Sequence, residues 1–177
     1  MKLSDGEKLI LVLLGAIAKE LKITDPDPRL IIAAILSGHT WALKEELPGV
    51  FEAEEQDRAA VREVNDILDM WWFIEMAHKR LSAADKKRVK KEAAPYDAKF
   101  QGFDGNSEPQ FGTATFLIKA LGRFSELGDR SLNSNMPVVP AYRRMLKKFS
   151  PMRSSLSEDG LTAEQIIELL LEQKHPS

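Results

Sequence analysis

The sequence contains no cysteine among its 177 residues. That absence excludes disulfide bonds, thiol nucleophiles, iron–sulfur clusters and thiolate zinc sites. Net charge is also small: 25 basic and 27 acidic side chains give -2 at pH 7, so the overall charge attracts neither nucleic acid nor an anionic membrane. The three histidines, His39, His78 and His175, are scattered rather than spaced as metal ligands. We therefore expect no metal ion and no cofactor.

Common catalytic signatures are absent as well. The sequence has no G-x-S-x-G nucleophile elbow, no H-E-x-x-H zinc motif and no dinucleotide-binding G-x-G-x-x-G. The carboxylates of Asp66, Asp69, Glu75, Asp104 and Glu108 can share acid–base chemistry only if the fold brings them together. The sequence thus favours a protein that is not an enzyme.

Long hydrophobic runs are also missing. The stretch Leu9 to Ala18 (LILVLLGAIA) has ten residues, whereas a bilayer-spanning helix needs about 20. The residues before it carry no net positive charge, as a secretory signal would require. Ser4 and Glu7 have the spacing of a capping box at a helix start. We expect a buried first helix, no membrane association and a cytoplasmic protein.

Helical periodicity dominates the rest of the chain, and runs that alternate polar and apolar residues are nearly absent. The sequence therefore predicts an all-α, single-domain bundle over residues 1–177, with about seven to eight helices and one long central helix. An N-terminal helical part covers about 4–93. A loop and a C-terminal helical part cover about 94–173.

The long helix is predicted from about Glu54 to Leu81. Its apolar residues step by three and four, which places them along one seam: Val64, Ile67, Trp71, Ile74 and His78. Neighbouring apolar residues widen this face, so it must be covered either by the same chain or by a second subunit. A homodimer that uses this seam as its interface is one hypothesis.

Two segments rich in basic residues follow. Lys86, Lys87, Arg88, Lys90 and Lys91 lie in a helix that we expect to start after Ser82. Five charges so close together can contact phosphate, but no aromatic residue interleaves with them, so a solvated face is the simpler interpretation. A later helix, from about Val138 to Phe149, has a basic outer face that includes Arg143.

The segment Phe100 to Glu108 (FQGFDGNSE) superficially resembles a calcium loop. An EF-hand needs glycine and glutamate where this chain has Pro109 and Thr115, so the spacing excludes it. We interpret the segment as a bend, with Ser107 as the cap of a helix that extends to Leu127. The polar bend NSNMP follows that helix, so the two bends should lie roughly 30 Å apart at 1.5 Å per residue.

Several longer motifs resemble one family of bacterial proteins. They are FQGFDGNSEPQF, TATFLIKALGRFSEL, LNSNMPVVPAYRRML, SGHTWALKEEL and VNDILDMWWFIEMA. Together they are similar to the YfbU family over nearly the whole chain, from SDGEKLIL to LTAEQIIELL. The resemblance implies a largely helical, cytoplasmic protein and implies no particular activity. Family members have histidine in the sequence NSHMP where this chain has Asn135, and an amide does not titrate and is a poor transition-metal ligand.

Three functions remain open on this basis. The favoured one is a non-catalytic interaction or regulatory module that self-associates or binds another protein. The second is a small-ligand or hydrolytic site near the two polar bends, lined by a set of polar and charged residues: Asp104, Asn106, Glu108, Arg123, Asn133, Asn135 and Arg143. The third, nucleic-acid binding by the N-terminal helices, is disfavoured because Leu30 to Leu47 presents mainly apolar side chains plus Lys44.

Overall fold

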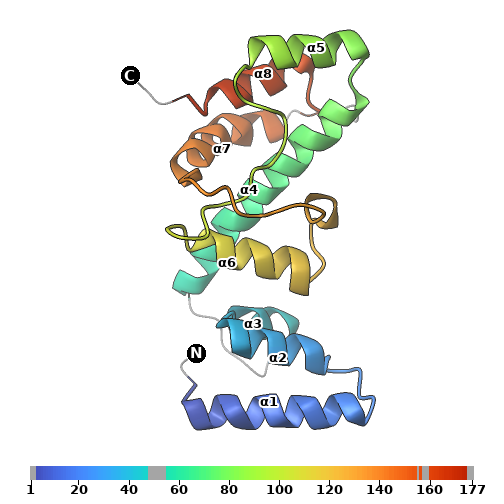
Figure 1. The fold of residues 1–177 in the computed structure, drawn as a ribbon, viewed down its shortest axis with the longest axis vertical. Coiled ribbons are helices and arrows are strands. Elements are labelled where there is room, and N and C mark those ends of the chain that lie inside the picture. The colour runs from blue at the N-terminus through green and yellow to red at the C-terminus, as the bar shows by residue number, and fades with distance from the viewer. Residues whose placement is uncertain (1–2, 48–54, 155, 157–159, 175–177) are drawn as a thin grey trace.

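The computed structural model describes residues 3–47, 55–154, 156 and 160–174 (Figure 1). Its α-helices are α1 (Asp5–Glu20), α2 (Pro28–Ser37), α3 (Trp41–Glu46), α4 (Glu55–Arg80), α5 (Ala83–Glu92), α6 (Gln110–Thr115), α7 (Val139–Arg153) and α8 (Ala163–Leu171). Within these ranges there is no strand, and an isolated bridge joins Phe103 and Asn133. The all-α bundle is thus confirmed. The expected tail at His175 lies outside the described residues.

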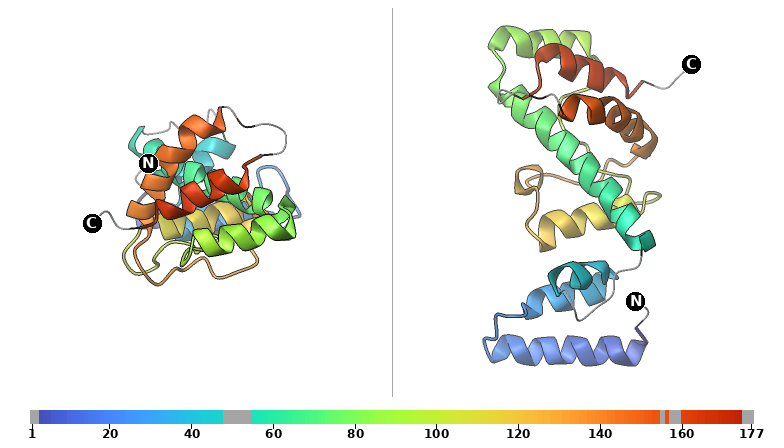
Figure 2. Two further views of the ribbon diagram at one scale, coloured as in Figure 1. Left: turned by 90° about the horizontal axis from the view of Figure 1, so that it is seen from above. Right: turned by 180° about the vertical axis from the view of Figure 1, so that it is seen from behind.

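The helices form an elongated stack (Figure 1). Helix α1 lies at one end, followed by α2 and α3, and α4 then runs obliquely through the rest of the molecule. Helices α5 and α8 pack side by side at the other end, as both views in Figure 2 show. At 26 residues, α4 is the predicted long central helix, roughly 39 Å long at 1.5 Å per residue.

The seam of α4 forms the core of the protein. Val64, Ile67, Trp71 and Ile74 are at most 1% exposed, and α6, α7 and α8 of the same chain pack on this helix. The chain itself therefore covers these four residues, which leaves them almost no surface for a second subunit. His78, near the end of the seam, is only half-buried.

Helix α1 corrects a second expectation. The capping box of Ser4 and Glu7 is present, but Gly15 is the only residue of α1 that is fully buried. There α2 comes so close that a Cβ on Gly15 would lie 2.7 Å from a side-chain carbon of Ile32. A single neighbouring helix covers only one side of α1, and α1 stands at the end of the stack, so its other side remains exposed (Figure 2).

The predicted helix from Ser107 to Leu127 is also wrong. Helix α6 ends at Thr115, continues as one π-helical turn over Phe116–Ala120, and stops. Gly122 then takes a left-handed conformation with φ 67°, which glycine adopts without a steric penalty, and the chain turns back. As a result, Leu132 lies beside Phe103, whose backbone N–H donates to the Leu132 carbonyl at 2.9 Å. The two polar bends are therefore adjacent and not about 30 Å apart.

Candidate functional site

The two bends meet in what we call the polar junction, formed by residues 102–108 and 131–139. Asn133 is its centre, because its side-chain oxygen accepts from the backbone N–H of Gly105 at 3.0 Å and of Asn135 at 2.9 Å. Ser134 N–H also donates to the Phe103 carbonyl at 3.1 Å. Segments far apart in the sequence are thereby joined through backbone groups.

Glu108 joins the junction to α7. One carboxylate oxygen accepts from the backbone N–H groups of Val138 and Val139, both at 2.7 Å, and the other accepts from Asp104 N–H at 2.8 Å. The first N–H groups of a helix have no partner within the helix, and a carboxylate also interacts favourably with the positive end of the helix dipole. Glu108 therefore caps the start of α7 from a segment about 30 residues earlier in the chain.

Asp104 is buried and organises the loop around it. Its carboxylate accepts from the hydroxyl of Ser107 at 2.6 Å and from the backbone N–H of Asn106 at 3.1 Å. These hydrogen bonds stabilise the ionised form and lower the pKa of Asp104. Ser107 thus holds the loop and is not the helix cap that we expected.

Backbone geometry explains two residue choices in the junction. A Cβ on Gly102, where φ is 89°, would lie 1.9 Å from the carbonyl oxygen of Leu132, so only glycine fits. Asn135 has φ 54°. This is the left-handed region, in which asparagine and histidine are among the few enriched non-glycine residues. Asparagine in this chain and histidine in the family pattern therefore both suit the backbone at this position.

The two arginines of the predicted ligand site form ion pairs with carboxylates outside the junction. Arg123 forms ion pairs with Glu45 and Glu46 of α3, at 3.3 and 3.4 Å. Arg143 pairs with both carboxylate oxygens of Glu63 on α4, at 2.6 and 3.1 Å. The structure therefore brings together five of the seven predicted residues, and those five hydrogen-bond to each other and to nearby backbone.

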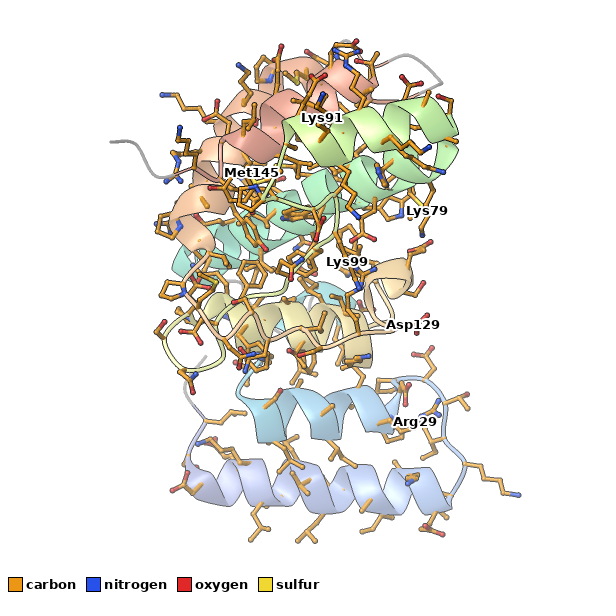
Figure 3. All side chains as sticks on the ribbon, turned by 45° about the horizontal axis from the view of Figure 1, so that its top comes forward. Arg29, Lys79, Lys91, Lys99, Asp129 and Met145 are labelled. Atoms are coloured by element: carbon orange, nitrogen blue, oxygen red, sulfur yellow. The ribbon has the colours of Figure 1, made fainter. Side chains whose placement is uncertain are left out.

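A different surface stands out on α1. Six aliphatic side chains, which we call the α1 stripe, are between 54 and 67% exposed: Leu9, Ile10, Leu13, Leu14, Ile17 and Leu21. Their spacing of three and four places them on one helix face, opposite the side that packs on α2. Figure 3 shows side chains along α1 that project away from the rest of the molecule.

Sequence reasoning found the apolar residues of α1 but not their exposure. An apolar run shows that a helix can bury a face, whereas the number of neighbours depends on the position of the helix in the fold. Large exposed apolar patches on folded proteins are typical of surfaces that contact another protein, a membrane or a ligand.

The nucleic-acid hypothesis loses its main basic residue. Lys44 of α3 is only 6% exposed, so its ammonium group is not presented as on a recognition helix. In the ranges that the structure describes, no group of three or more acidic or histidine side chains is arranged to hold a metal ion. Over the same ranges, no helix is both long enough and apolar enough to cross a bilayer.

Comparison with protein families agrees with the motifs quoted above. The model of the YfbU domain matches residues 1–170, which is almost the whole chain. The match includes α1 and its stripe, the polar junction and all but the last residue of α8. The chain therefore belongs to the YfbU family.

Proposed function

We propose that this protein is a non-catalytic interaction module that self-associates, and that the α1 stripe of one copy binds the α1 stripe of a second. The observation that carries the proposal is the exposure of six large aliphatic side chains on one face of one helix. With roughly 100 Å² exposed per side chain, the stripe reaches the upper end of the largest apolar patches on monomers, about 300–600 Å².

The area of the stripe suits a second copy. Two stripes packed together bury roughly 1,200 Å², which is the lower limit for stable protein–protein interfaces. A two-fold axis also lets one patch satisfy itself, since the same residues face each other on both copies. Because α1 lies at the end of the stack, a second molecule meets no obstruction from the body (Figure 1).

The test is the oligomeric state of a Leu13→Glu variant. Leu13 lies in the middle of the stripe and is 54% exposed, so a carboxylate there leaves the monomer folded but becomes buried in a dimer. The matched control is Leu171→Glu, the same change at an exposed leucine of α8, far from α1. Mass is measured by analytical ultracentrifugation over tens to hundreds of micromolar, with circular dichroism as the check on folding.

We expect a dimer for the wild type and for Leu171→Glu, and a folded monomer for Leu13→Glu. A wild type that stays monomeric across this range refutes self-association and leaves the stripe to a different protein partner. A Leu13→Glu dimer, or equal dissociation of both variants, refutes the assignment to α1.

A further inference from the structure

A cavity of about 500 Å³ lies far from α1, between the end of α4, helix α5, the segment 96–99 and Arg130. Cavities that bind small molecules typically measure about 300–1,000 Å³. Figure 3 labels Lys79 and Lys99, which lie on this side of the molecule below α5. The size of the cavity is therefore suited to a small organic ligand.

Positive charge is concentrated around the cavity. Six cationic side chains line it: Lys79, Lys86, Lys87, Lys90, Lys99 and Arg130. Only two carboxylates accompany them, Glu75 and Asp97, so the lining carries 6 − 2 = +4. The whole chain has a net charge of -2, which means that this concentration is local and not a result of composition.

One of the two carboxylates is already neutralised. Glu75 is 5% exposed and pairs with Arg130 through both oxygens, at 2.6 and 2.9 Å. One of those oxygens also accepts from the backbone N–H of Phe100 at 2.8 Å. This buried pair fixes α4 to two loops and forms a preorganised wall. The five lysines then face a single remaining carboxylate, Asp97.

Helix α5 separates its charges by face. Lys86, Lys87 and Lys90 are spaced one, three and four residues apart, so they fall within about 100° of the helix circumference, on the side of the cavity. Arg88 points elsewhere and pairs with Glu92 and with Glu164 of α8. The structure gives no carboxylate within ion-pair distance to these three lysines among the residues that it describes.

The cavity is not purely polar. Tyr96, Val89 and Ala98 contribute apolar surface to the lining, and the ring of His78 is half-buried in it. Burial lowers the pKa of His78, and the charge of Lys86 lowers it further, against smaller opposing effects of Glu75 and Asp97. At neutral pH the ring is thus uncharged and presents one hydrogen-bond donor and one acceptor.

We infer that this cavity binds a small organic phosphate, whose phosphate group is held by the lysines and whose apolar or ring portion lies against Tyr96 and its neighbours. Ammonium groups bind phosphate as point charges, and several of them suit a group with more than one negative charge. A planar carboxylate is better matched by the fork of an arginine, and the one arginine here is engaged with Glu75. The inference does not depend on self-association through α1.

The probes are inorganic phosphate, adenosine monophosphate and adenosine, titrated into the protein by calorimetry at low salt. Adenosine monophosphate should bind more tightly than inorganic phosphate, and adenosine, which lacks the charge, should bind least. A double variant, Lys87→Gln with Lys90→Gln, should weaken adenosine monophosphate at least about tenfold, because it removes two charge-assisted contacts. Both lysines are exposed, so the variant should fold.

The control variant has the same loss of charge at lysines outside the cavity, Lys91→Gln with Lys147→Gln, both exposed. Equal weakening by the two double variants, or no binding of adenosine monophosphate at millimolar concentration, overturns the inference. The inference is also overturned if the protein binds single-stranded DNA or anionic vesicles more tightly than adenosine monophosphate and the Lys87 and Lys90 changes do not weaken that binding.

A second readout locates the ligand by proton NMR. A phosphate bound next to His78 should raise the pKa of that ring, while His39, held by the indole N–H of Trp41 at 3.2 Å elsewhere in the fold, should titrate unchanged. Binding without a change at His78 places the ligand outside this cavity and refutes the assignment.

Discussion

The polar junction is open to a direct test with two glycines. Gly102 and Gly38 both have positive φ, 89° and 76°, but their surroundings differ. A Cβ on Gly102 would lie 1.9 Å from the Leu132 carbonyl oxygen, whereas a Cβ on Gly38 meets nothing within 4 Å. Replacing each with alanine therefore separates the backbone penalty from the close approach of the two bends.

The expected magnitudes follow from these contacts. Gly38→Ala should lower the free energy of unfolding by about 1–2 kcal/mol, which is the penalty of a left-handed conformation for a residue with a Cβ. Gly102→Ala has the same penalty and must also push Leu132 away. This breaks the bonds from Phe103 N–H to the Leu132 carbonyl and from Ser134 N–H to the Phe103 carbonyl, at about 1 kcal/mol each. We expect a total loss of about 3–4 kcal/mol, at or above the upper end of the usual range for a single substitution, about 0.5–3 kcal/mol.

Urea unfolding followed by circular dichroism at several wavelengths measures both values, with the slope of the transition as a check that each variant unfolds in the same way. The two variants should differ by about 2 kcal/mol or more. If they lose equal stability, the bends do not approach each other at Gly102 as described, and the account of the polar junction fails.

Two further predictions concern the carboxylates of the same junction. Glu108→Ala leaves three backbone N–H groups without their acceptor, so it should lower the free energy of unfolding by about 3 kcal/mol. Urea titrations measure this loss, and a loss under about 0.5 kcal/mol contradicts the capping role. Asp104 has a lowered pKa in the folded protein, so its contribution is present above the unfolded pKa of about 3.9 and is lost as the pH falls below that value. Asp104→Asn should be less stable than the wild type at pH 7, and the difference should shrink below about pH 4; a difference that is independent of pH refutes this role.

Helix starts were predictable because they are local. The capping box at Ser4 and the cap at Ser82 each depend on residues three positions apart, and both are present. Such a motif satisfies backbone groups within its own turn, so its physics does not depend on the rest of the fold. Ser107 shows the limit, since a nearby carboxylate on Asp104 competes for its hydroxyl.

The polar junction was not predictable in the same way. Its residues were singled out correctly as polar bends, but their proximity depends on the π-helical turn after α6 and on the reversal at Gly122. A helical pattern continues through this region in the sequence, and a π-helical turn leaves little trace in apolar spacing. Distance along an assumed straight helix therefore gave the wrong separation between Asp104 and Asn133.

Helices α4 and α1 differ in how far the chain itself covers their apolar faces. Both carry apolar residues at helical spacing, and because the pattern on α4 is longer, a second subunit was one hypothesis for what covers it. In the fold, α4 crosses the middle of the molecule and three later helices cover it, whereas α1 lies at the end and, among the described helices, packs mainly on α2. Apolar periodicity shows how much surface a helix can bury, and the fold decides how much of that surface the same chain covers. On α1, much of the apolar face stays exposed after the chain has folded. A second copy that covers this face removes that apolar surface from water, so the exposed area, and not the length of the apolar pattern, identifies where binding is most favourable.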